Sequence, residues 1–289
     1  MSNIRIITDS ASDLSVAEEI AYGIRMIPFP VILGGKSYLS RVDFDNEGFY
    51  DLMARYPDEL PATAQIMPFE FQQIMQEEVD AGNDALLFIL INSEGSATYS
   101  NAILAKDAFF EEHPEYRGKV RIEAVDSRGY SALYGYPVVE AAKMVRSGAE
   151  FEDVVAYVRN SIEKRRIYFG IYSLKYAGKS GRIPTAAAFL GDKLGLKPVM
   201  KIFDHEITTA AKARGESKLI PMVADLTLRD MAPGTPYQII YGCEPEDRDK
   251  MENLMTERLD YGPTGFYQIG AVIAANAGPR VAGVCFDIL

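Results

Sequence analysis

A cluster of small and hydroxylated residues follows a long apolar run near the end of the first third of the chain. The run ends at Ile91, and the next residues read "NSEGSATYS", with Ser96 and Thr98 directly before an apolar-periodic segment. The backbone N–H groups at the start of a helix are unpaired, and together with a hydroxyl they can hold a carboxylate or phosphate without a cation. We therefore expect an anion-binding tip here, with Ser96 as the N-cap of a helix.

Other segments provide what a polar-headed lipid would need. The loop "LPATAQIMP" carries a second hydroxyl, Thr63, among mainly apolar residues. Two stretches rich in small and branched apolar residues, "IPTAAAFLGDKLGL" and "GAVIAANAGP", are candidate walls, and the second contains the amide of Asn276. A few polar donors facing a large apolar wall are the general form of such a site.

Catalytic chemistry at these residues is less well supported. The chain has two histidines, His113 and His205, and we interpret both as surface residues. A serine–histidine triad needs a nearby base, and the G-x-S-x-G elbow is absent, so we predict no catalytic residues. An acyl- or phosphoryl-transfer enzyme that uses Ser96, and a regulator that senses acyl chains, remain the alternative interpretations.

Nucleotide and metal sites are also disfavoured. Neither the G-x-x-x-x-G-K-[ST] nor the G-x-G-x-x-G pattern occurs. Asp9, Asp13 and Asp126 could approach one another, but aspartates that follow strands usually close turns and cap helices. We expect no metal and no cofactor.

Composition narrows the possible partners. The 289 residues carry a formal net charge of −11, which argues against nucleic acid because phosphate binding needs a basic surface. The chain has no apolar run of about 20 residues, so we expect no stable membrane insertion. Two cysteines and an N-terminus without a signal-peptide pattern indicate a cytoplasmic protein.

The order of predicted elements gives the fold class. Strand and helix patterns alternate through the first half, which predicts a parallel sheet with helices on both faces. Three predicted strands end in polar pairs, Asp9-Ser10, Asn92-Ser93 and Asp126-Ser127, so these tips should gather at one edge, where α/β sheets bind ligands.

The second half has a different character. It reads as α+β with a hairpin that turns at Asp204-His205, a short apolar helix over 186–195, and a strand followed by a loop over 265–278. We therefore predict two domains, 1–163 with an α/β fold and 164–289 with an α+β fold.

Six motifs in order resemble the DegV family of bacterial fatty-acid-binding proteins, over nearly the whole chain. They are "IITDSASDL", "PATAQIMPFEF", "NSEGSATYSNA", "VDSRGYSALYGY", "LKYAGKSGRIPTAAAFLGDKLGLKPVMKI" and "IGAVIAANAGPRVAGV". The fifth, a Gly-Arg-Ile block that ends in Lys-Pro, is the most specific.

The resemblance implies a long-chain fatty acid buried between the two domains. It also implies that the protein presents this acid to a separate dihydroxyacetone-kinase-like fatty-acid kinase, which makes the acyl phosphate. The family's carboxylate-binding threonine and serine fall on Thr63 and Ser96, and its arginine falls on Arg182, with a role in partner contact or structure. The chain departs from the family pattern at Ala97, where glycine is usual, and at Asn276, where histidine is usual.

Overall fold

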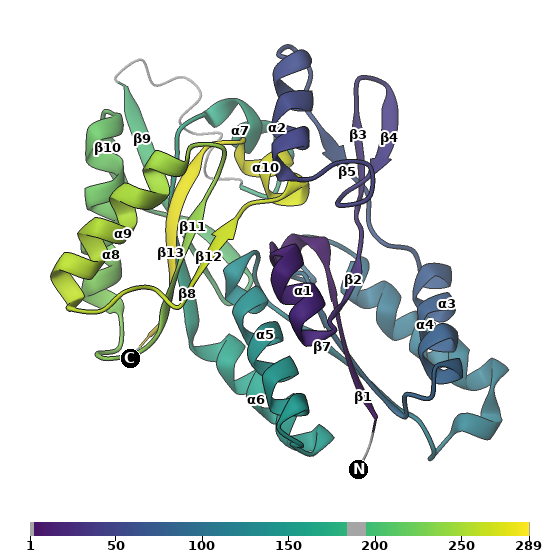
Figure 1. Cartoon of the computed structure of the whole chain (residues 1–289). Coiled ribbons are helices and arrows are strands. Elements are labelled where there is room, and N and C mark those ends of the chain that lie inside the picture. Colours follow the sequence, from purple (N-terminus) through teal and green to yellow (C-terminus); the bar gives the residue numbers. More distant parts are fainter. Residues whose placement is uncertain (1–2, 184–194, 289) are drawn as a thin grey trace.

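The computed structural model describes residues 3–183 and 195–288 of the chain. Two sheets lie side by side in Figure 1, a parallel one built from the first half of the chain and a mixed one built from the second half. A small third sheet and two short helices, α7 and α10, lie near the top of the interface between them.

The parallel sheet has the strand order β2-β1-β6-β7. Its strands are β1 (Ile4–Asp9), β2 (Arg25–Ile27), β6 (Ala85–Leu90) and β7 (Arg121–Asp126). Figure 1 shows helices on both sides of it, which are α1 (Val16–Tyr22), α3 (Pro68–Asp80), α4 (Thr98–Glu112), α5 (Ala132–Arg146) and α6 (Phe151–Lys164). Every residue of β6 is buried, as expected for a central strand covered on both faces. This confirms the predicted α/β architecture.

The mixed sheet has the strand order β10-β9-β8-β13-β11-β12. Its strands are β8 (Arg165–Ile171), β9 (Leu196–Phe203), β10 (Glu206–Arg214), β11 (Tyr237–Tyr241), β12 (Gly265–Gln268) and β13 (Val281–Asp287). Two helices pack on its outer face, α8 (Leu219–Asp230) and α9 (Pro245–Leu259). The predicted β9–β10 hairpin is confirmed, with Asp204 and His205 both at positive φ in its turn.

The remaining described elements are a third sheet, three helices and three 3₁₀ turns. The third sheet has the order β4-β3-β5, and these strands are β3 (Pro30–Leu33), β4 (Lys36–Leu39) and β5 (Ala62–Thr63). The helices are α2 (Asn46–Arg55), α7 (Leu174–Ser180) and α10 (Ala271–Ala277), with single 3₁₀ turns at 10–12, 114–116 and 216–218.

Several local predictions are corrected. Residues 271–277 form helix α10 rather than a loop, because the alanine-rich segment has high helix propensity. Helix α8 was not anticipated, although its buried residues follow a helical period. Of the apolar helix predicted over 186–195, residues 186–194 lie outside the described residues. The domain boundary between 163 and 164 remains a prediction; β8 begins at Arg165.

Hydrogen bonds on one side of the interface join the two sheets through α10. The main-chain N–H of Gly270, just before α10, donates to Asp13 Oδ1 at 2.8 Å. The hydroxyl of Tyr50 on α2 donates to the carbonyl of Ile269. Because these contacts hold the start of α10 against the first half of the chain, they fix one wall of the space between the sheets.

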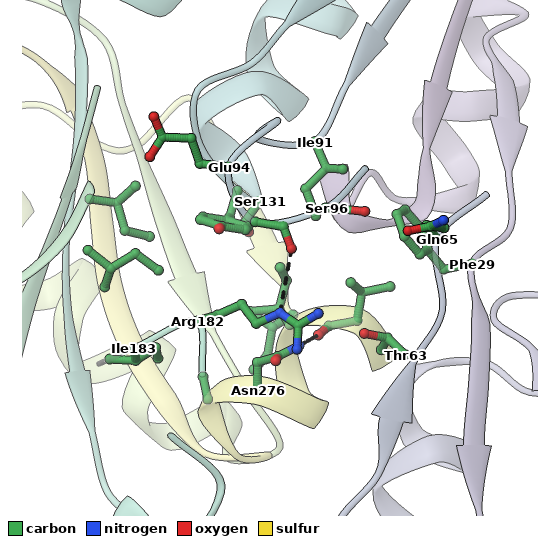
Figure 2. A pocket seen from close by; sticks show the side chains of 18 of the residues that line it. Phe29, Thr63, Gln65, Ile91, Glu94, Ser96, Ser131, Arg182, Ile183 and Asn276 are labelled. Atoms are coloured by element: carbon green, nitrogen blue, oxygen red, sulfur yellow. Dashed lines mark hydrogen bonds between the residues drawn. The ribbon is translucent and has the colours of Figure 1, made fainter. Parts of the chain in front are cut away.

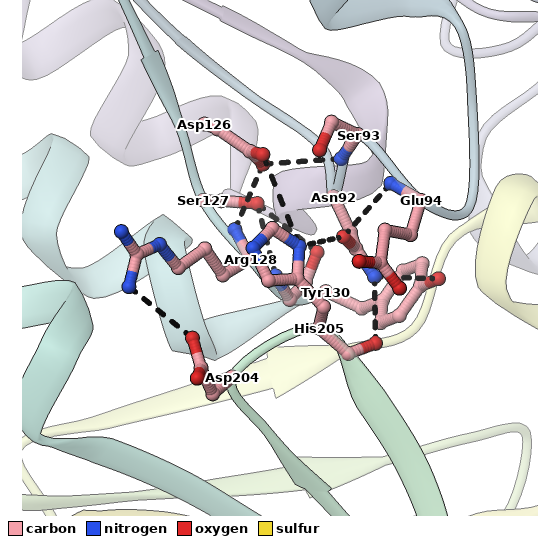
Figure 3. Close-up of polar contacts among 10 residues, drawn as sticks. Asn92, Ser93, Glu94, Asp126, Ser127, Arg128, Tyr130, Asp204 and His205 are labelled. Carbon is pink, nitrogen blue, oxygen red and sulfur yellow. Dashed lines mark hydrogen bonds and ion pairs between the residues drawn. The ribbon is translucent and has the colours of Figure 1, made fainter.

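A second set of contacts joins the β9–β10 turn to the tips of the parallel strands (Figure 3). The side chain of Asn92 donates to the carbonyl of His205 at 2.9 Å, and the N–H of His205 donates to the carbonyl of Arg128 at 2.9 Å. Arg128 also forms an ion pair with Asp204 at 3.2 Å. His205 is therefore half-buried in an interface, not a surface residue as the sequence suggested.

A candidate head-group site in the cavity between the sheets

A cavity of about 730 Å³ lies between the two sheets, within the range usual for small-molecule sites. Its wall includes all four residues that the sequence analysis selected, Thr63, Ser96, Arg182 and Asn276. They come from β5, the loop after β6, the segment after α7, and α10 (Figure 2). Residues up to 213 positions apart in the sequence therefore meet in one place.

Two aspartates at strand tips fix the loop that carries Ser96. Asp9 Oδ2 accepts from the N–H of Ile91 at 2.7 Å, and Asp126 Oδ1 accepts from the N–H of Ser93 at 3.1 Å. Asp9 is fully buried and also accepts from the Tyr134 hydroxyl at 2.6 Å. Burial raises the pKa of Asp9 to about 6. The predicted gathering of polar strand tips at one edge is thus confirmed, and the aspartates act there as acceptors for main-chain N–H groups.

Helix α4 brings Thr63 to the same place. Thr98 Oγ1 accepts from the N–H of Ile66 at 3.2 Å, and the Asn101 side chain donates to the carbonyl of Ile66 at 2.8 Å. Both main-chain groups of residue 66 are therefore held by α4. Thr63, three residues earlier and paired with Val31 of β3, is placed at the cavity wall as a result.

Ser96 does not act as the predicted N-cap. Helix α4 begins at Thr98 with Ala97 as its N-cap residue, because residues 92–96 first form a turn. The N–H groups of Gly95 and Ser96 both donate to the carbonyl of Asn92, so these two amides are not available to a ligand. The serine side chain is left as the polar group that faces the cavity.

The hydroxyl of Ser96 is arranged to donate a hydrogen bond. Ser96 Oγ and Thr98 Oγ1 are 2.9 Å apart, and Ser96 Oγ also accepts from the N–H of Thr98 at 3.3 Å. Thr98 is fully buried and its oxygen already accepts from Ile66, so its proton needs an acceptor, and Ser96 Oγ provides one. With Thr98 as the donor in this pair, the proton of Ser96 is left for a ligand.

A cation stands beside the tip, contrary to the expectation that the hydroxyls act without one. Arg182 Nε donates to the carbonyl of Gly95 at 3.5 Å, next to Ser96. Figure 2 shows the guanidinium in the wall that also carries Thr63 and Asn276, whereas the carboxylate of Glu94 points away from Ser96 and Thr63. The guanidinium therefore offers a cation to an anion at the tip, although the carboxylates of Glu70 and Glu94 also belong to the cavity wall. Sequence spacing could not reveal this, because Arg182 lies 86 residues after Ser96.

The side chain of Asn276 has fewer hydrogen-bonding groups available to a ligand than the sequence suggested. Its Nδ2 donates to the carbonyl of Val272 one turn earlier in α10, at 2.8 Å. A carbonyl can only accept, so the amide orientation is fixed, and Oδ1 and the second N–H of Nδ2 are the groups that remain. In this orientation Asn276 lines the cavity with one N–H committed to Val272 and one left for a ligand.

One apolar part of the wall comes from the mixed sheet, which the sequence analysis did not identify. The face of this sheet toward the cavity is rich in branched side chains: Ile167, Phe169, Ile202, Ile207, Ile240 and Val281. The predicted apolar segments also contribute, through Ile183, Val272, Ile273 and Ala277. Alternation along β8, with Ile167 and Phe169 two residues apart, was the available signal.

Other sites are not evident within residues 3–183 and 195–288. No three His, Cys, Asp or Glu side chains of this part lie where they could hold a metal ion. Nor does any helix there combine the length and apolarity needed to cross a bilayer. The ring of His205 contacts Asn92 Oδ1 at 2.8 Å. It is therefore paired with Asn92 and not with the Ser96 hydroxyl.

The chain as a whole matches known proteins. Residues 3–288 match the family model described as uncharacterised proteins of the DegV family. The chain belongs to the DegV family. A DegV domain-containing protein of Caldanaerobacter subterraneus subsp. tengcongensis is 31% identical over 290 residues, covering 99% of both chains.

Two solved structures share the fold. A stearic-acid-binding protein from Eubacterium ventriosum superposes with a TM-score of 0.87 at 24% identity, over 99% of this chain and 97% of the other. A DegV family protein from Thermus thermophilus, described by its fatty acid binding, has a TM-score of 0.86 at 25% identity, over 99% and 100%. The resemblance predicted from the sequence motifs is confirmed.

Proposed function

We propose that this protein binds a long-chain fatty acid and carries it to a partner enzyme. The carboxylate lies at the tip formed by Thr63 and Ser96, beside the guanidinium of Arg182. The alkyl chain lies in the apolar part of the cavity. The observation that carries this proposal is one cavity in which hydroxyls and a cation meet a wall of branched apolar side chains.

The free energy of binding divides between the alkyl tail of the fatty acid and its carboxylate head group. Each buried methylene contributes about 0.8 kcal/mol, so about fifteen contribute on the order of 12 kcal/mol before the costs of ordering and immobilisation. The head-group contacts need only offset the desolvation of the carboxylate. The tail therefore supplies most of the affinity, and the head-group contacts set the orientation of the carboxylate.

The family resemblance supports a second part of the proposal, presentation of the bound acid to a dihydroxyacetone-kinase-like fatty-acid kinase. An oriented carboxylate next to an exposed Arg182 suits this role, because the kinase must reach the carboxylate while the tail stays buried. The protein is then a carrier and contributes no catalytic residue of its own.

An enzyme that uses Ser96 as a nucleophile is disfavoured by the contacts of that residue. Its side-chain partner is another hydroxyl, that of Thr98, and not a base. The two solved structures described above are named for fatty-acid binding and not for a reaction. An acyl-chain-sensing regulator would use the same cavity and differs only in its partner.

The test of binding starts from purified protein whose organic extract is examined by mass spectrometry. We expect a co-purifying long-chain fatty acid, and the delipidated protein should bind palmitate in titration calorimetry. Failure to bind any acid of about fourteen to eighteen carbons, the range that a tail of this energy implies, would contradict the proposal. Hydrolysis of model esters would instead favour the enzyme.

A further inference from the structure

The side chain of Tyr130, which the sequence analysis did not select, lies at the junction of two cavities. It lines the large cavity and also a neighbouring pocket of about 460 Å³. Gly95 and Arg182 line both spaces as well. Tyr130 therefore stands at the polar end of the large cavity, where the proposed head group would lie.

The hydrogen bonds around Asn92 determine what the phenol can do. Asn92 Nδ2 donates to the carbonyl of His205 at 2.9 Å, and Asn92 Oδ1 accepts from the N–H of Glu94 at 3.1 Å, so the amide orientation is fixed. The same Nδ2 donates to the hydroxyl of Tyr130 at 3.2 Å (Figure 3). The phenol oxygen is thus an acceptor in this contact and keeps its own proton. Among the described residues no acceptor for that proton is present.

The position of Gly95 places this proton close to the tip. A Cβ added at Gly95 would overlap the Tyr130 hydroxyl, so the close approach depends on glycine at this position. Gly95 directly precedes Ser96, whose hydroxyl also has a proton left to donate. The two hydroxyls therefore flank the same short stretch of main chain.

The phenol is in the protonation state that a donor needs. Burial raises the pKa of Tyr130 above its usual value of 10, although the bond from Asn92 and the charge of Arg182 oppose this shift. At neutral pH the hydroxyl is consequently neutral and protonated.

We propose that Tyr130 donates a hydrogen bond to the carboxylate of the bound long-chain acid, as a further head-group residue beside Ser96 and Thr63. This inference rests on the proposed function. The phenol adds a donor to the one N–H that Asn276 keeps beside its bond to Val272.

The test compares Tyr130→Phe with the wild type, both delipidated, using palmitate and 1-hexadecanol as probes. Loss of a hydrogen bond to a charged group should weaken palmitate binding roughly 10- to 150-fold. Hexadecanol has a neutral oxygen and the same tail, so its affinity should fall less than about 10-fold. The variant should fold normally, because the ring remains and Asn92 keeps its bond to His205. Tyr116→Phe, on a residue stacked against Phe109 and absent from the cavity wall, is the matched control.

The outcomes separate this inference from the proposed function. If the wild type binds palmitate and Tyr130→Phe binds it equally well, the role of Tyr130 is wrong and the carrier function stands. Equal losses for palmitate and hexadecanol would also overturn the inference, since they would indicate a change in the shape of the cavity. If the wild type binds neither probe, the carrier function itself fails.

Discussion

At the scale of single residues, the hydroxyl tip works through a short chain of hydrogen bonds. The N–H of Ile66 donates to Thr98, and the hydroxyl of Thr98 in turn needs Ser96 as its acceptor. Thr63 approaches from the other side and has no side-chain hydrogen bond to another described residue. The hydroxyls of Ser96 and Thr63 can therefore donate to a ligand without first breaking another hydrogen bond, which lowers the reorganisation cost of binding.

This arrangement predicts the effect of removing the hydroxyls. Ser96→Ala should weaken binding of palmitate about 10- to 150-fold, because a hydrogen bond to a charged group contributes roughly 1.5 to 3 kcal/mol. The double variant Ser96→Ala, Thr63→Ala should lose more, measured by titration calorimetry with the delipidated protein. Ser37→Ala, on the exposed strand β4, serves as the control and should bind like the wild type. Unchanged affinity in the double variant would rule out both hydroxyls as head-group contacts.

The residue types of this site were readable from the sequence, but their contacts were not. A run of hydroxyls after a buried strand indicated an anion site, and both Thr63 and Ser96 do line the cavity. The cation at Arg182 and the phenol at Tyr130 were missed as parts of the same wall, because no local pattern links residues that meet only after folding. The orientation of Asn276 depends on a single carbonyl of α10, which a sequence does not show either.

At the scale of elements, α10 forms part of the cavity wall and is held by a buried carboxylate. Asp13, just after β1, accepts from the N–H of Gly270 at the start of α10, and it is only 6% exposed. Burial raises the pKa of Asp13 to about 7. Since α10 carries Val272 and Asn276 into the wall, we expect the ionisation state of Asp13 to affect the packing of the site.

The sign of this coupling predicts a pH dependence of stability. A carboxyl group with a raised pKa in the folded state contributes stability that is fully present below its unfolded value of 3.8 and is lost as the pH rises toward about 7. The free energy of unfolding should therefore fall over this range. The contribution of Asp13 is at most about 4 kcal/mol, at about 1.4 kcal/mol per pKa unit.

The substitution Asp13→Asn isolates the contribution of Asp13 to the pH dependence of the free energy of unfolding. An asparagine tolerates the left-handed backbone at this position (φ 54°) and can still accept from Gly270, but it does not titrate. Urea unfolding at about pH 5 and about pH 8 should show a smaller difference in the variant than in the wild type. Asp58→Asn, on an exposed loop residue, should leave the difference unchanged. An equal pH dependence in Asp13→Asn and wild type would contradict the coupling.

Element prediction succeeded where a segment carried its own signal. The continuous apolar run before Asn92 predicted a buried strand, and every residue of β6 is buried. Helix α10 was taken for a loop because its seven residues are too short to show a helical period. Its conformation is stabilised by contacts with residues more than two hundred positions earlier, such as Asp13 and Tyr50.

At the scale of the whole molecule, the cavity lies between the mixed sheet and the loops at the tips of the parallel strands, and the two halves of the chain are joined at both sides. The contacts of α10 with Asp13 and Tyr50 join one side, and those of the β9–β10 turn with Asn92 join the other. A bound alkyl chain would thereby lie between halves of the chain that the sequence could assign only separately. The polar end of the cavity, in contrast, includes an exposed residue, Arg182, where a partner could approach.

This asymmetry predicts separate effects of Arg182 on binding and on presentation. The guanidinium stands beside the tip, so Arg182→Ala should weaken palmitate binding, but modestly, because the tail supplies most of the affinity. Phosphorylation of the bound acid by a fatty-acid kinase, in a reconstituted assay with saturating palmitate, should fall much further. In the wild type the guanidinium would orient the carboxylate and contact the transferred phosphoryl group. A misplaced carboxylate reacts slowly even when the acid is bound.

The variant Arg182→Lys should retain more of the binding than of the phosphorylation, since lysine keeps the charge and loses the bidentate geometry. Equal losses of binding and phosphorylation, together with a lowered melting temperature, would instead assign Arg182 a structural role through its bond to Gly95.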